Sequence, residues 1–213
     1  MKSILYKDKN ATEIEDKKLI SYLVFNLLSR KKDDFHNKCV DKIMETIQTK
    51  EWKLKYKSSH FIHIVDIYSR ENYGELKFMW MCQVLELLYF FIIYNSPNPS
   101  SAKLSEIHFY DKLGDLYKYF YNGREIRAEN SKIIKMLRNS VAHTGTLEVI
   151  EETLGKEDLG SFKKAKENNI NLRELALSFD LLVADMFLRC LGLEDDEMYV
   201  NGVPPQFLNI FKN

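Results

Sequence analysis

The stretch Phe78–Tyr94 reads FMWMCQVLELLYFFIIY. Whether it crosses a membrane or packs inside a soluble core determines the class of fold. It is barely long enough to cross a bilayer. Gln83 and Glu86 stand near its middle, where a charge costs several kcal/mol in lipid. We therefore expect a buried core helix, in a protein that makes no membrane contact.

The composition favours helices around such a core. Of 213 residues, 45% are apolar and 13% aromatic, and only 8 Gly and 4 Pro are present to punctuate short strands. Lys and Arg together number 31, as do Asp and Glu, so no global field draws the chain to a polyanion. Any site for a polyanion must be a local patch. We expect one compact unit.

The three cysteines, Cys39, Cys82 and Cys190, are odd in number, far apart and set in apolar helical patterns. This usage is typical of buried thiols in a reducing compartment. The apolar run near the N-terminus is only three residues long before charges follow, which argues against a secretory signal peptide. We predict a cytoplasmic protein.

Hydrophobic periodicity extends the helical interpretation along the chain. The connection from 144 to 169 is polar and has no strong period, whereas Asn171 with Glu174 resembles a capping box and Gly192 a helix end. The segment 61–68 can also be read as a strand. The fold class is all-α, a bundle of six or seven helices, predicted over 12–30, 33–47, 61–68, 74–94, 104–121, 128–143 and 171–190.

The helix predicted over 128–143 carries the residues with most chemical potential, in the run LRNSVAHTG from Leu137 to Gly145. Ile133, Ile134, Leu137 and Val141 form its apolar stripe. The side chains outside that stripe are free for contacts with a ligand. They are Lys132, Lys135, Arg138, Asn139 and His143.

Helical geometry sets how these side chains diverge. Arg138 and His143 are about 140° apart around the helix and roughly 7.5 Å apart along it. Asn139 lies one turn before His143, where its amide can orient the imidazole. Ala142 is small and lies over Arg138, which leaves the guanidinium room to reach a phosphate.

The motif RNSVAH, from Arg138 to His143, resembles the Arg-(four to six)-His motif of the HEPN superfamily of helical nucleases and nucleotide-binding proteins. The upstream helix KFMWMCQVLELLYFF, with Glu86, looks like the long HEPN helix that carries a Glu before aromatic residues. The resemblance covers about Gly74 to Leu193. It implies an HEPN-like helical domain over 71–213, with 1–70 as an additional helical extension packed on that core.

By the same resemblance, the chain is expected to be a metal-independent RNA endonuclease without cofactor. Its products would be 2′,3′-cyclic phosphate and 5′-hydroxyl ends. His143 would move protons and Arg138 would stabilise charge on the phosphate. Asn139 and Glu86 would support them, and Lys132 and Lys135 would contact the RNA.

The family also implies a homodimer whose two motif helices share one cleft. The biological setting it implies is a toxin or an anti-phage defence effector, with an antitoxin or regulatory protein as a further partner. The alternative is a noncatalytic HEPN-like module that binds a nucleotide or a protein.

Simpler roles exist for several of these residues. Arg138 and His143 near a helix end can answer the helix dipole, and Glu86 can be a core carboxylate satisfied by Tyr or Lys. His60, His63 and Asp66 have the spacing of metal ligands on a helix, but without a cysteine partner we expect surface histidines and no metal site.

Overall fold

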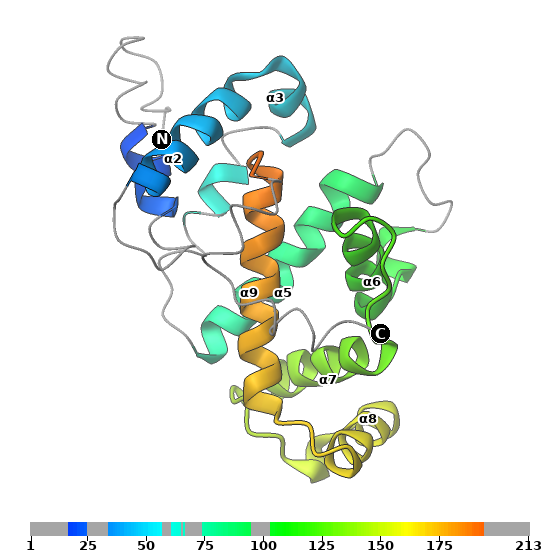
Figure 1. Cartoon of the computed structure of the whole chain (residues 1–213). Helices are drawn as coiled ribbons and strands as arrows, with labels where there is room; N and C mark the ends of the chain where they lie inside the picture. Colours follow the sequence, from blue (N-terminus) through cyan, green and yellow to red (C-terminus); the bar gives the residue numbers. More distant parts are fainter. Residues whose placement is uncertain are drawn as a thin grey trace, which may run out of the picture. The chain divides into compact units, whose positions relative to one another are not determined.

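The computed structural model describes residues 17–24, 34–56, 61–64, 66, 74–94 and 103–193, and this part of the chain is all-α without a strand (Figure 1). The chain divides into two compact units rather than the single unit expected. Of the described residues, 17–66 and 187–193 belong to the first unit, and 74–186 belong to the second. The first unit therefore includes a segment that the sequence analysis assigned to the C-terminal domain.

Most predicted helices are present, with shifted ends. Residues 17–24 and 61–64 are also helical, so the strand reading of the latter is wrong. The bounded elements are α2 (Asp34–Gln48), α3 (Lys50–Tyr56), α5 (Glu75–Tyr89), a π-helical turn (Phe90–Tyr94), a 3-10 turn (Leu104–Glu106), α6 (Phe109–Phe120), α7 (Ala128–Thr144), a second 3-10 turn (Glu151–Thr153), α8 (Lys156–Glu167) and α9 (Leu172–Cys190).

Three kinds of contact stabilise the first unit: a hydrogen bond at the start of α3, contacts of the Trp52 ring, and close packing at Gly192. The Thr49 hydroxyl accepts the N–H of Trp52 at 3.2 Å, which starts α3 directly after α2. The Trp52 indole donates to the Cys190 carbonyl at 2.6 Å, and Phe61 lies edge-on to Trp52 at 5.8 Å between ring centroids. Gly192, which ends α9, has a φ of +89°, and a Cβ there would collide with Thr46.

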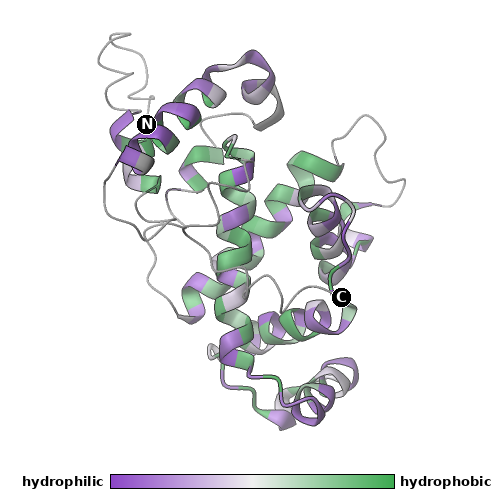
Figure 2. Cartoon of the chain, viewed as in Figure 1, coloured by the Kyte–Doolittle hydropathy of each residue, from purple (hydrophilic) through white to green (hydrophobic). Residues whose placement is uncertain are grey.

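The core of the second unit is formed by α5, α6, α7 and the part of α9 up to Met186. Phe78 and Phe179 are fully buried, and their ring centroids are 5.8 Å apart. Phe109 adds a third ring, 6.5 Å from Phe179. Hydrophobic residues run along much of α5 and α9, as Figure 2 shows. This aromatic core fixes the helices that carry the site residues.

The helical stretch Glu75–Tyr94 is long and apolar enough to cross a bilayer by length and composition, and half of its apolar window is buried inside the chain. Its buried residues include Phe78, Leu85 and Leu88. Such burial within the chain is what a core helix requires. The absence of membrane contact and the cytoplasmic location stay predictions.

Two local features follow the sequence closely, and one departs from it. The Asn171 side chain accepts the N–H groups of Arg173 and Glu174 at 3.1 and 3.2 Å, so the predicted cap of α9 is confirmed. All three cysteines are buried thiols that form no disulfide, as expected. The connection predicted to be irregular contains a full helix, α8, and that prediction is wrong.

Candidate functional site

α7 presents the motif from a well-defined helix end. Gly145 takes the left-handed conformation with a φ of 73°, and its N–H binds the Val141 carbonyl at 2.8 Å. The predicted apolar stripe is confirmed, because its four members are all buried. They are Ile133, Ile134, Leu137 and Val141.

Arg138 projects from α7 toward α5 and α6. Its Nη2 donates to Glu86 Oε1 at 2.9 Å, and the two side chains are 29% and 30% exposed. The guanidinium carbon lies 5.2 Å from the centroid of the Phe109 ring, within cation–π range. Arg138 and Glu86, predicted separately as site residues, therefore lie in direct contact.

Lys112 joins the same carboxylate from α6. Its Nζ lies 3.4 Å from Glu86 Oε2, and its side chain is only 8% exposed. Glu86 thus neutralises one of two cations, and the group formed by Glu86, Lys112 and Arg138 keeps one net positive charge. Lys112 was not among the residues predicted from the sequence, although its place beside Phe109 and Leu116 on the buried face of α6 was a signal.

Cys82 lies one turn before Glu86 on α5 and borders this group. Burial raises the pKa of its thiol, an effect that nearby Arg138 opposes and Glu86 reinforces. The thiol stays protonated at neutral pH. It is therefore unsuited to be a nucleophile.

Lys135 and Asn139 turn toward α8 instead. Lys135 Nζ lies 2.9 Å from Asp158 Oδ1 and 3.0 Å from Glu157 Oε2. Asn139 Nδ2 donates to Asp158 Oδ2 at 2.8 Å. Burial lowers the pKa of Lys135, but the two carboxylates outweigh it and raise that pKa above its ordinary value.

These contacts bear on two predicted roles. The charge of Lys135 is matched within the chain and its side chain is 19% exposed, so RNA would compete with two carboxylates for it, and its contact with RNA stays a prediction. The amide nitrogen of Asn139 binds Asp158 and not the imidazole of His143. Both contacts come from α8, a helix that was not predicted from the sequence. Lys132 remains exposed, with its Nζ 5.7 Å from the centroid of the Tyr110 ring.

His143 is exposed near the C-terminal end of α7, at the edge of a small pocket. We call this the α7–α8 pocket. It has a volume of about 160 Å³, and one of its lining side chains, Ser140, is buried with a hydroxyl that has no hydrogen-bond partner. Its lining residues are Asn139, Ser140, His143, Thr153, Leu154, Gly155 and Asp158.

The predicted residues thus fall into two groups around α7. Arg138 belongs with Glu86, and His143 belongs with Asn139 around the α7–α8 pocket. Within the described residues, no hydrogen bond or ion pair joins Arg138 to His143.

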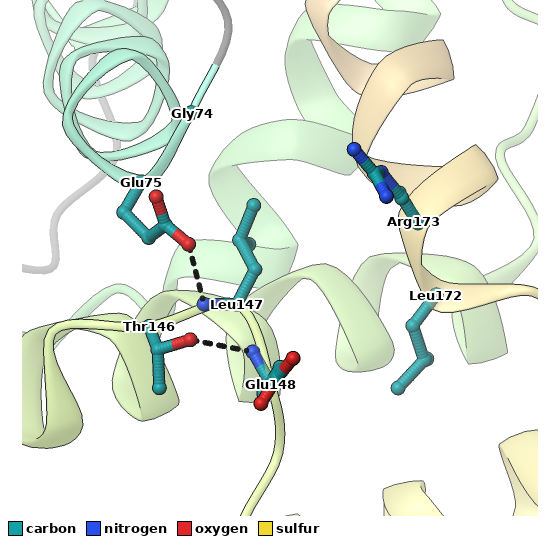
Figure 3. A pocket seen from close by; sticks show the side chains of 7 residues that line it. All are labelled: Gly74, Glu75, Thr146, Leu147, Glu148, Leu172 and Arg173. Atoms are coloured by element: carbon teal, nitrogen blue, oxygen red, sulfur yellow. Dashed lines mark hydrogen bonds between the residues drawn. The ribbon is translucent and has the colours of Figure 1, made fainter.

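A larger pocket of about 380 Å³ lies between the starts of α5 and α9 and the loop after α7 (Figure 3). Glu75 Oε1 accepts the N–H of Leu147 at 3.4 Å there, and Arg173 lies on the opposite side. This pocket contains neither Arg138 nor His143, so it is separate from the residues predicted to form the site.

In the described part of the chain, no three His, Cys, Asp or Glu side chains form a group that could hold a metal ion. His60 lies outside the described residues, and His63 is exposed. Comparisons of the chain with family models, curated proteins and solved structures gave no match.

Proposed function

We propose that this protein is a metal-independent endoribonuclease in which Arg138 and His143 act on the same phosphate. The main observation in support of the proposal is the environment of the Arg138 side chain. Its guanidinium is held by Glu86 and Phe109, is partly exposed, and belongs to a group with one surplus positive charge. The RNSVAH motif and the all-α fold support the resemblance to HEPN nucleases.

The chemistry needs one base, one acid and one anion stabiliser. The ribose 2′-hydroxyl gives its proton to a neutral imidazole and attacks the adjacent phosphorus. The bond from phosphorus to the 5′-oxygen breaks, and that oxygen takes a proton from an imidazolium. A 2′,3′-cyclic phosphate and a 5′-hydroxyl result, with no water consumed.

Arg138 suits the role of anion stabiliser. Only Nη2 is engaged with Glu86 among the described residues, so the other terminal nitrogen can donate to a nonbridging phosphate oxygen. A guanidinium group is charged at any physiological pH. Lys112 keeps Glu86 from cancelling the whole positive charge of the site.

The divergence of Arg138 and His143 supports a site built by two copies of the chain. A two-fold axis beside α7 would bring Arg138 of one copy toward His143 of the other. The two imidazoles would then supply the base and the acid. Lys132, exposed on the same helix, would contact the flanking phosphates.

The wider setting is part of the proposal and follows from the resemblance alone. It is a cytoplasmic toxin or anti-phage effector, restrained by an antitoxin or another regulatory protein.

The test is cleavage of a 5′-labelled RNA by the purified wild-type chain in excess EDTA. We expect fragments with 2′,3′-cyclic phosphate ends, recognised by their shift in mobility after acid opening and phosphatase treatment. Cleavage that needs added Mg²⁺, or products with plain 3′-hydroxyl ends, would contradict the mechanism.

The alternative, a noncatalytic binding module, has one observation in its favour. The Glu86–Arg138 pair joins α5 to α7, which is a structural role that Arg138 can fill without catalysis. A wild-type chain that binds RNA or a nucleotide without cutting it would establish that alternative.

A further inference from the structure

The α7–α8 pocket carries an unexplained polar group. Ser140 is only 2% exposed, and its hydroxyl oxygen has no hydrogen-bond partner. Buried hydroxyls are almost always bonded, because an unmet one has lost its water without compensation. Ser140 is also one of the residues that line the pocket, so its hydroxyl lies next to the space that a bound molecule would fill.

The start of α8 adds donors to the same pocket. Gly155 is the N-cap of this 12-residue helix, and no side chain caps it. The first N–H groups of a helix have no partner inside the helix. Gly155 lines the pocket, and a Cβ on it would meet nothing within 4 Å. The N–H groups of the first turn of α8, which have no partner inside the helix, therefore lie beside the pocket.

The charges around the pocket argue against a phosphate in it. Asp158 lines the wall and Glu157 precedes it, while Lys135 is their shared cation. These three side chains sum to one net negative charge. A neutral ligand with its own hydrogen-bonding groups fits this field better than an anion does.

Size and lining narrow the ligand further. Pockets for drug-sized ligands measure about 300–1,000 Å³. The volume of about 160 Å³ therefore suits a group smaller than a whole nucleotide. Leu154 offers an apolar wall, while Asn139 and Ser140 offer polar atoms. A nucleobase combines a flat apolar face with polar edges in this size class.

We propose that the α7–α8 pocket binds one nucleobase of the RNA, next to the phosphate that is cut, and so sets a base preference. This inference rests on the proposed function for its link to cleavage, because His143 lies on the rim of the same pocket. The binding itself does not require cleavage. Ser140 and the first turn of α8 read the polar edge of the base.

The first experiment measures binding of adenosine, guanosine, cytidine and uridine to the full chain by saturation-transfer NMR titration. We expect at least one nucleoside to bind at millimolar concentration. Gly155→Leu adds a large side chain to the lining of the pocket and should weaken that binding at least tenfold. Gly160→Leu, on the same helix but outside the pocket, is the matched control and should leave binding unchanged.

Ser140→Ala is the second variant, should Gly155→Leu fail to fold. Loss of one hydrogen bond should weaken binding roughly threefold to tenfold. The proposal is overturned if no nucleoside binds, or if the nucleoside binds the wild-type and these variant chains equally.

A cleavage assay on four RNAs that differ in one base beside the cut separates the two proposals. We expect the wild-type chain to prefer one base, and Gly155→Leu to lose that preference. RNA cleavage with the same preference in both chains would sink the pocket assignment and leave the nuclease standing. Nucleoside binding that depends on Gly155, in a chain that cuts no RNA, would support the pocket and remove the nuclease.

Discussion

The Arg138 guanidinium and the Glu86 carboxylate meet at 2.9 Å between Nη2 and Oε1, with each side chain about one-third exposed. Glu86 also receives Lys112, so this one carboxylate ties α5 to both α6 and α7. The contact gives Arg138 a fixed direction without consuming its full bonding capacity. We therefore expect the Glu86–Arg138 pair to contribute both to the stability of the fold and to the proposed activity.

Glu86→Gln should lower the free energy of unfolding by about 1–3 kcal/mol. The substitution leaves Arg138 and the almost buried Lys112 as neighbouring cations without their shared counter-charge. Urea denaturation monitored by circular dichroism measures the loss. An unchanged free energy of unfolding would contradict this prediction. It would mean that water replaces the Glu86 carboxylate around Arg138 and Lys112 at little cost in free energy.

Lys112→Met in the Glu86→Gln background should recover most of that loss. The substitution removes the surplus cation and retains an apolar chain of similar length. The same substitution in the wild-type chain is the control, and it should not stabilise. A double variant no more stable than Glu86→Gln alone would show that charge repulsion is not the cause.

Because of Cys82, we expect the free energy of unfolding to depend on pH in the alkaline range. Burial raises the pKa of this thiol above its ordinary value of 9.0, so the folded chain keeps a proton that the unfolded chain loses. The stabilisation is complete below that value and falls as the pH rises beyond it. At pH 10 the loss should be about 1.4 kcal/mol. In Cys82→Ala, the drop in unfolding free energy between pH 8 and pH 10 should be smaller by that amount, and equal drops in both chains would contradict it.

Ser140→Ala should be neutral or stabilising, because it removes a buried hydroxyl that has no partner. Ser131 on the same helix is the matched control, since its hydroxyl donates to the Ala128 carbonyl at 2.9 Å. We expect Ser140→Ala to be about 1 kcal/mol more stable than Ser131→Ala in urea denaturation. The reverse order would show that the Ser140 hydroxyl is satisfied in solution.

Local signals were enough to predict the helices that have strong caps and stripes. Asn171 marked the start of α9, and the buried stripe of α7 left Arg138 and His143 outside it. α8 gave no such signal, because only Asp158, Phe162 and Ala165 are buried along its 12 residues. Its position depends on contacts with α7 that no periodicity reveals.

The candidate site, like the fold, was predictable only in part from the sequence. The divergence of Arg138 and His143 follows from helical geometry and is present in the structure. The partners of Lys135 and Asn139 were not predictable, because both bind Asp158 of the missed helix. Packing between the two helices, and not local propensity, decides such contacts.

A composite site predicts rescue between inactive chains. Arg138→Ala and His143→Ala chains, each inactive, should regain cleavage when mixed under conditions that allow exchange of subunits. The heterodimer keeps one Arg138 and one His143 across its cleft. No recovery, with heterodimers present in native mass spectra, would mean that each site is built within one chain.

The most direct measurement is the single-turnover rate of RNA cleavage in EDTA for the wild-type, Arg138→Ala, Arg138→Lys and His143→Ala chains. We expect each alanine variant to be roughly 10²–10⁴ times slower than the wild-type chain, with unchanged circular dichroism spectra. Arg138→Lys should also lose most activity, because a point charge does not replace the guanidinium fork. Cleavage by the two alanine variants at the wild-type rate would contradict the assignment of Arg138 and His143 as catalytic residues.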